Sequence, residues 1–279
     1  MDRLKSLNTL VFRAILTMGR SKRFKDASYR HVSMFSITQI RTKKLRAYKT
    51  FFGLQEDIPL SYFYLLSQEA QASQMLDKNF PLPIPGMIHL ESEMTFLNEQ
   101  IREEEIQLVS EVVIMNKEEG SLVPLFIEEY FQEGIKIVEV KSRYLVKRKS
   151  KKKKREKTIL DQNDSDNWIS STWKLKSNLG LKYARISGDF NPIHISTPLA
   201  WIFGLRKKII HGWYLLSRAV AEIEAETDMP AKSIEVKFLG ALALPSTNEF
   251  GFRVSNRRNL EFRIKNTDTN KTSVSGYIS

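Results

Sequence analysis

The stretch YARISGDFNPIHISTPLAWIFGLRKKIIHGWYLL, Tyr183 to Leu216, carries most of what the sequence says about the fold. Gly188-Asp189 and Asn191-Pro192 are turn-forming pairs within it. Asp189, Asn191 and His194 are therefore expected on a tight loop rather than inside a regular element. Two of the four histidines in the chain, His194 and His211, fall in this window.

The residues that follow this loop predict a long buried helix. Ile209, Trp213, Leu216, Val220 and Ile223 are spaced 4, 3, 4 and 3 residues apart, which places them on one helical face. His211-Gly212 stands at the start of this helix, where free backbone N–H groups and the positive end of the helix dipole collect. Strand-like segments come next: SIEVKFLGALAL (233–244), EFGFRVSN (249–256), LEFRIKN (260–266) and TSVSGYIS (272–279).

The first half of the chain repeats this plan of one helix followed by strands. Pro59 can open a helix, and Phe63, Leu66 and Ala70 follow at spacings of three and four. Strand candidates follow a proline-rich break at 80–86: MIHLESEMTF (87–96), IQLVSEVVIM (106–115), VPLFIEEYF (123–131) and GIKIVEVKSRYLVKR (134–148). A long helix followed by antiparallel strands, twice over, predicts an α+β fold in which each helix crosses the concave face of a curved sheet.

The loop and the helix start together resemble the signature of the MaoC-like dehydratases and R-specific enoyl-CoA hydratases. That signature joins an aromatic residue, a small residue, Gly-Asp-x-Asn-Pro, an aliphatic residue and His, and then Ala or Ser six positions later. The matching residues here are Tyr183, Ser187, Gly188, Asp189, Asn191, Pro192, Ile193, His194 and Ala200, with Gly204 and His211-Gly212 downstream. The detailed resemblance covers roughly residues 180–245. It implies a double hotdog fold, with two long central helices each wrapped by a curved antiparallel sheet.

The resemblance also implies a site and a reaction. Asp189 and His194 would be the catalytic pair, holding one water for addition to a trans-2-enoyl thioester. The Gly212 N–H would receive the enolate oxygen, and Asn191 would support the loop or bind substrate or water. The same site would dehydrate an (R)-3-hydroxyacyl thioester. Such chemistry needs no metal or redox cofactor, and the sequence signals none.

The first half carries no second copy of this loop, so we expect one active site per chain. Asp57 precedes its helix, but Tyr62 and not a histidine stands five positions later. His89 lies in a strand-like segment with no Gly-Asp or Asn-Pro loop nearby. By resemblance, the helix of this half and its apolar neighbours would line a tunnel for longer acyl chains. That expectation fails if longer enoyl chains are no better substrates than a four-carbon one.

Positive charge is concentrated in two segments. The chain has a net charge of +12; residues 1–50 carry +11 and the run KRKSKKKKREK at 147–157 carries +8, so the rest is acidic, at −7. This run is a solvated hairpin tip or linker, or else a contact for phosphate or an acidic partner. The candidate contact residues are Lys147, Arg148, Lys149, Lys151 and Lys152. Either the phosphates of coenzyme A or an acyl carrier protein would suit such a patch.

Charge and composition also suggest an organisation. We expect a basic N-terminal segment (1–50), a degenerate N-terminal hotdog (51–146), a basic linker or loop (147–165) and a catalytic MaoC-like hotdog (166–279). With no cysteine, the chain can have neither disulfides nor thiolate metal sites, which fits a cytoplasmic protein. No apolar run is long enough for a membrane span, and Arg13 interrupts the one N-terminal apolar run. A transit peptide stays open.

Two other functions compete with the hydro-lyase reading. A hotdog acyl thioesterase would use the same substrates, although the Asp-x-Asn-Pro-x-His loop argues against it. A non-catalytic binding module would grip nucleic acid or anionic membrane with its basic arms. The run at 147–157 has no interleaved aromatic residues on which bases could stack, so no specific nucleic-acid contact is expected. A monomer that forms its own pseudo-dimer, or a homodimer, would be consistent with two hotdogs in one chain.

Overall fold

The structure is a computed structural model that describes residues 2–4, 14–17, 19–20, 29–116, 121–147, 167–256 and 259–279. Its strands are β1 (Asp2–Arg3), β2 (Tyr29–Ile37), β3 (Ile88–Phe96), β4 (Ile106–Asn116), β5 (Ser121–Gln132), β6 (Ile135–Lys147), β7 (Ile169–Leu175), β8 (Ser233–Phe238), β9 (Ser246–Asn256), β10 (Asn259–Asn266) and β11 (Lys271–Ile278). Its helices are η1 (Ile15–Thr17), α2 (Lys43–Phe52), η3 (Leu60–Tyr62), α3 (Phe63–Leu76), α4 (Leu179–Ser187), α5 (Pro192–Ile195), α6 (Thr197–Ile202) and α7 (Gly212–Thr227). Within these ranges, none of the helices combines the length and apolar character that crossing a bilayer requires.

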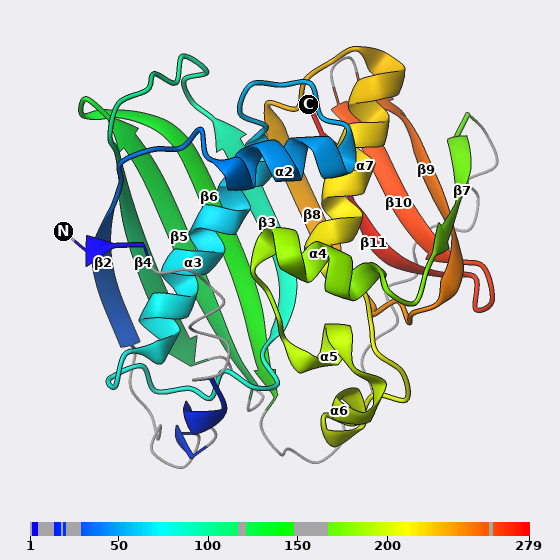
Figure 1. The fold of residues 1–279 in the computed structure, drawn as a ribbon, viewed down its shortest axis with the longest axis horizontal. Coiled ribbons are helices and arrows are strands. Elements are labelled where there is room, and N and C mark those ends of the chain that lie inside the picture. Colours follow the sequence, from blue (N-terminus) through cyan, green and yellow to red (C-terminus); the bar gives the residue numbers. More distant parts are fainter. Residues whose placement is uncertain are drawn as a thin grey trace.

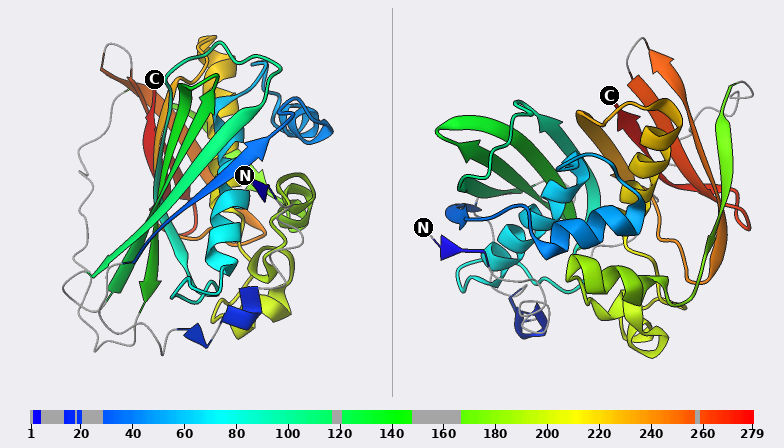
Figure 2. Two further views of the ribbon diagram at one scale, coloured as in Figure 1. Left: turned by 90° about the vertical axis from the view of Figure 1, so that its left-hand side faces the viewer. Right: turned by 45° about the horizontal axis from the view of Figure 1, so that its top comes forward.

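The eleven strands form one continuous sheet in the order β1-β2-β4-β5-β6-β3-β8-β11-β10-β9-β7. All neighbouring pairs are antiparallel except β1 and β2, which are parallel. The two halves of the chain meet at β3 and β8, where Ser92 pairs with Val236 and Met94 with Ile234. The sheet curls around the helices, which all lie on one side of it (Figures 1 and 2). The fold is therefore α+β, with two hotdog halves that share one sheet.

Each half has one central helix, as the spacing of apolar residues predicts. The helix opened by Pro59 begins with the turn η3 and continues as α3, while the second central helix is α7. The predicted strands of both halves are confirmed as β3 to β6 and β8 to β11. Ile209 lies outside α7, in an isolated bridge with Ala243, so the helical spacing places it wrongly inside the helix. The reason is that its backbone pairs outside the helix, since its N–H donates to the Ile193 carbonyl oxygen at 3.0 Å.

Two elements between residues 29 and 52 complete the first half. Strand β2 pairs with β4 along its whole length, and helix α2 follows it. Tyr48 of α2 is fully buried, and its hydroxyl lies 2.9 Å from the Ser61 hydroxyl and 2.7 Å from that of Ser217. Helix α2 thus joins the start of α3 to α7 (Figure 1). The domain limits that charge suggests stay a prediction, because the basic run lies almost wholly outside the described residues.

Candidate active site

The candidate loop begins where α4 ends. Gly188 closes α4 in the left-handed conformation (φ 85°), which a residue without a Cβ adopts at little cost. The backbone then turns sharply at Asp189, whose Oδ1 accepts a hydrogen bond from the N–H of Asn191 at 3.1 Å. This Asx turn fixes the carboxylate against its own loop. The turn predicted from Gly188-Asp189 is therefore confirmed.

His194 lies in the four-residue helix α5 rather than on an irregular loop, so that part of the prediction is wrong. Asn191 caps α5 by accepting the N–H of Ile193 at 3.4 Å, and Pro192 at the first position favours a helical turn over an open loop. The α5 backbone packs against Gly180 of α4 so closely that a Cβ on Gly180 would overlap the His194 carbonyl oxygen. Gly180 is thus needed to place His194, and the sequence alone gives no sign of it.

The hydrogen bonds of His194 define its tautomer. Nδ1 lies 3.0 Å from the carbonyl oxygen of Ile209, which can only accept, so Nδ1 carries the hydrogen. In the neutral ring, Nε2 then presents a lone pair. No described residue forms a hydrogen bond with it. His194 is therefore oriented as a base.

His211 supports the site from the start of α7. Its ring stacks on that of His194 with centroids 3.7 Å apart, and its Nε2 donates to the backbone carbonyl of Asp189 at 2.9 Å. Its Nδ1 is buried and has no hydrogen-bond partner among the described residues. The N–H of the His211 ring is used in its hydrogen bond to the Asp189 backbone. We therefore infer that His211 positions Asp189 and His194.

The carboxylate of Asp189 and the imidazoles of His194 and His211 offer polar atoms that all lie within 4.8 Å of one another. Two hydrogen bonds of about 2.8 Å that meet at one water separate its two partners by about 4.5 Å. The polar atoms of Asp189 and His194 are therefore close enough to share one water. A metal ion fits less well, because the two rings are stacked within 25° of parallel and their in-plane lone pairs do not converge.

Protonation states follow from the burial of this cluster. Burial alone would raise the pKa of Asp189, but the neighbouring histidines, the Asn191 N–H and the Gln68 amide together lower it. Burial lowers the pKa of His194 and takes that of His211 to about 3. Both imidazoles are thus neutral at pH 7, and the hydrogen bonds from Asn191 and Gln68 hold the carboxylate in its charged form.

Gln68 is the contribution of the first half, and the sequence analysis missed it. It extends from α3, and its Nε2 donates to Asp189 Oδ2 at 3.1 Å. Gln68 belongs to a run of polar residues, SQEAQASQ at 67–74, that interrupts an otherwise apolar buried helix. That interruption is the signal that could have identified it.

Gly212 is the first residue of α7, as predicted. No side chain caps this helix, and its first N–H groups have no partner within the helix. A Cβ on Gly212 would lie 2.8 Å from two ring carbons of Phe238 on β8. Only glycine therefore allows this helix start to approach β8 so closely, and its unpaired N–H lies next to the His194–His211 stack.

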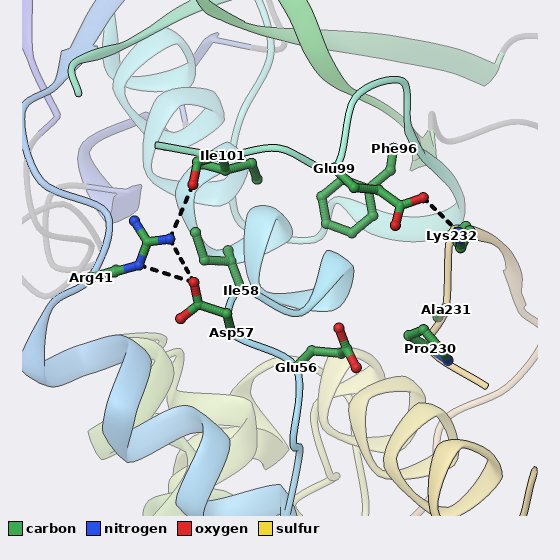
Figure 3. Close-up of a pocket in the computed structure, with 10 residues that line it drawn as sticks. All are labelled: Arg41, Glu56, Asp57, Ile58, Phe96, Glu99, Ile101, Pro230, Ala231 and Lys232. Atoms are coloured by element: carbon green, nitrogen blue, oxygen red, sulfur yellow. Dashed lines mark hydrogen bonds and ion pairs between the residues drawn. The ribbon is translucent and has the colours of Figure 1, made fainter. Parts of the chain in front are cut away.

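Asp57 occupies a different environment from Asp189. It lines a cavity of about 130 Å³ between the two halves, where Arg41 contacts it at 2.6 Å and also donates to the Ile101 carbonyl oxygen. Figure 3 shows this pair on one side of the cavity and the Lys232–Glu99 ion pair on the other. The hydrogen bond from Arg41 lowers the pKa of Asp57. No histidine lines this cavity.

Two cavities of the described residues lie away from the Asp189 cluster. The Arg41 cavity and an open hollow beside Trp201 and Arg206 both lack Asp189, His194 and His211. Of the basic residues predicted to contact phosphate or a carrier, Lys147 ends β6, and Arg148, Lys149, Lys151 and Lys152 lie outside the described residues.

Comparison with known proteins agrees with this description. Residues 150–276 match the family model of the MaoC-like domain. A 66-residue segment is 36% identical to 3-hydroxyacyl-thioester dehydratase X of Mycobacterium tuberculosis; it spans 24% of this chain and only 23% of that relative.

Solved structures extend the likeness in fold to nearly the whole chain. A crystal structure of HtdX from M. tuberculosis has a TM-score of 0.69 at 17% identity, covering 88% of this chain and 99% of that one. A MaoC-like dehydratase from Phytophthora capsici has a TM-score of 0.65 at 15% identity, covering 90% and 95%. A conserved hypothetical protein of M. tuberculosis with a double hotdog fold has a TM-score of 0.60 at 7% identity, covering 93% and 96%. Residues 150–276 thus resemble the MaoC-like domain, and the two halves of the chain together form a double hotdog.

Proposed function

We propose that this protein catalyses the reversible addition of water to trans-2-enoyl thioesters, giving (R)-3-hydroxyacyl thioesters. The observation that carries the proposal is the pairing of Asp189 and His194. One is a carboxylate held charged and the other a neutral imidazole with a free Nε2, and their polar atoms are close enough to share one water. The match of residues 150–276 to the family model of the MaoC-like domain supports the proposal.

The chemistry needs three functions from the protein. As the water oxygen bonds to the β-carbon, the Asp189–His194 pair removes one of its protons, and a proton is then delivered to the α-carbon. The net addition is one hydroxyl and one hydrogen across the double bond. Negative charge develops meanwhile on the thioester oxygen, and the unpaired Gly212 N–H at the α7 start is suited to stabilise it.

The remaining residues of the loop act on geometry. Asn191 caps α5, and its N–H forms the Asx turn with Asp189. We therefore assign Asn191 the role of positioning the loop, in preference to that of contacting the substrate. His211 holds the backbone of Asp189 in place. The proposed R stereochemistry rests on the resemblance of the loop to the signature of the R-specific enoyl-CoA hydratases.

The carrier of the acyl group is also part of the proposal. Basic segments at 1–50 and 147–157 suit either coenzyme A or an acidic carrier protein. The absence of cysteine fits a reducing compartment such as the cytoplasm. Because both hotdogs are in one chain, we expect a monomeric pseudo-dimer to be sufficient for activity.

Crotonyl-CoA tests the proposal directly. We expect loss of the conjugated enoyl absorbance, and chiral analysis of the product should give the R isomer. A thiol reagent in a parallel reaction distinguishes the thioesterase, which releases free coenzyme A. If the purified protein changes neither the enoyl absorbance nor the free thiol, with CoA or carrier-protein thioesters, it is not a thioester enzyme of this kind.

A further inference from the structure

The concave face of the first hotdog carries buried polar residues at the place where an acyl chain would run. Tyr144 donates to Gln71 Oε1 at 2.6 Å, and the Gln71 amide donates to Glu128 at 3.0 Å. The Tyr64 hydroxyl lies 3.2 Å from Nδ1 of His89, and 3.4 Å from the Tyr144 hydroxyl. These five residues, which we term the polar plug, connect α3 to β3, β5 and β6.

The rings of the polar plug reach the proposed active site. Tyr64 stacks on Trp213, the residue after Gly212, with centroids 3.6 Å apart. The His89 ring lies 4.5 Å from that of Tyr144 and 4.8 Å from that of Phe238. Phe238 is the ring that borders Gly212. The path from Gly212 into the first half is therefore filled by stacked rings.

The polar plug is neutral and its hydrogen bonds are satisfied internally. Burial raises the pKa of Glu128 to about 8. The Ser110 hydroxyl lies within hydrogen-bond distance of both Glu128 Oε1 and Gln74 Oε1, yet it has one hydrogen to donate. A protonated Glu128 resolves this, since it donates to Ser110, which donates to Gln74. Burial also lowers the pKa of His89, which keeps its imidazole neutral.

An apolar chain could not replace this network. Entry of a long acyl chain would separate Tyr64 from His89 and Tyr144, and methylene groups offer these buried hydroxyls no hydrogen bond. Each buried polar group left without a partner lowers affinity by about tenfold or more. A crotonyl group carries only one methyl group beyond its double bond and needs little of this path, whereas a long chain needs the space that the rings fill.

Building on the proposed function, we infer that the first hotdog excludes long acyl chains, and that the substrate is a short-chain enoyl thioester of about crotonyl size. Tyr64, His89 and Tyr144 then determine specificity by filling the channel. This replaces the expectation of a tunnel in the first half, because that expectation assumed apolar neighbours around its helix.

The test is the kcat/KM series for crotonyl-, trans-2-octenoyl- and trans-2-dodecenoyl-CoA. For the unaltered protein we expect dodecenoyl-CoA to fall at least about tenfold below crotonyl-CoA. Tyr64→Ala should raise the dodecenoyl-to-crotonyl ratio by about tenfold, because it removes the ring that stacks on Trp213. Tyr64→Phe keeps the ring and should preserve most of the discrimination.

Phe63→Ala is the matched control for folding. It removes a buried ring from the neighbouring position of α3 that packs on Tyr130 and Phe96, away from Trp213. It should lower stability and leave the ratio within about twofold. Dodecenoyl-CoA used as well as crotonyl-CoA by the unaltered protein would overturn the inference and leave the proposed function intact. No turnover of any chain length would overturn the proposed function itself.

Discussion

The concave faces of the two hotdogs have the same architecture, but they differ in the polarity of the buried side chains that lie under the central helix. Under α7 the sheet presents Trp173, Phe250 and Phe262, all fully buried. Under α3 it presents Ser110, Glu128 and Ser142, which are equally buried and hydrogen-bonded. Burying polar groups gives less stability than apolar packing of the same volume. The difference shows that apolar packing supports α7 at these positions of the second half, while buried, hydrogen-bonded polar groups fill the corresponding space in the first half.

The segment before each central helix differs as well. Before α7 the chain forms α4, α5 and α6, and this excursion carries Asp189 and His194. Before α3 it forms only α2 and a short connection that contains Asp57. In the second half, the segment that precedes the central helix thus carries the candidate site. The first half adds one side-chain amide, that of Gln68.

The sharpest test of this asymmetry exchanges one carboxylate in each half. Asp189→Asn should reduce kcat by about 10² to 10⁴-fold, because the amide can no longer accept a proton. Asp57→Asn should change kcat less than about twofold, because Asp57 pairs with Arg41 in a separate cavity. The measurement is crotonyl-CoA turnover, with circular dichroism to verify folding. Equal losses in the two variants would contradict the assignment of one site per chain.

The polar face of the first half predicts a pH-dependent stability. The pKa of Glu128 is about 8 in the folded state against 4.5 ordinarily, so the folded protein retains a proton that the unfolded chain loses. Stability from this group is fully present below about pH 4.5 and is lost as the pH rises toward 8. Between pH 5 and 7.5 the loss should be about 2 to 3 kcal/mol.

Urea unfolding of Glu128→Gln checks this, because the glutamine can donate to Ser110 at any pH. The free energy of unfolding of the variant should increase relative to that of the unaltered protein as the pH rises. Glu129→Gln is the control: its carboxylate is next in sequence but half-exposed and paired with Lys136, and it should not alter the slope. An unchanged slope in Glu128→Gln would show that Glu128 is charged in the folded protein.

Gly212→Ala tests how tightly the second half closes over its helix start. The added methyl would lie 2.8 Å from the Phe238 ring, so we expect about 2 kcal/mol of destabilisation in thermal unfolding. Activity should also fall, because the N–H of residue 212 moves with the backbone. Adding Phe238→Leu should recover much of the stability. If Gly212→Ala alone is as stable as the parent, the helix start is less crowded than described.

The smallest effect is expected for Gln68→Met, which removes the amide that links the halves. The turnover should fall by about tenfold, and the acidic limb of the kcat/KM profile should move to higher pH. The direction follows because the Gln68 hydrogen bond lowers the pKa of Asp189. Glu69→Gln, on the same helix, should leave the limb in place. A loss of turnover with an unmoved limb would assign Gln68 to packing alone.

Patterns that depend on a few neighbouring residues were readable from the chain. The alternation in 88–96 and 260–266 and the spacing in 213–223 predicted β3, β10 and α7, because one buried face imposes a period. The strand β2 and helix α2 were not predicted, since the sequence analysis described residues 1–50 only as a basic segment. The loop with Asp189 was predicted, but its turn of helix at His194 was not.

By itself the sequence determined the fold class and the two central helices with the strands that follow them, because these depend on local spacing, and a short linear signature singled out the Asp189–His194 loop. Only the tertiary structure decided that Gln68 completes the Asp189 site, that Gly180 must lack a side chain, and that Tyr64, His89 and Tyr144 close the first half. These contacts join residues that are distant in the chain, and only the folded sheet with its two central helices brings them within hydrogen-bond distance.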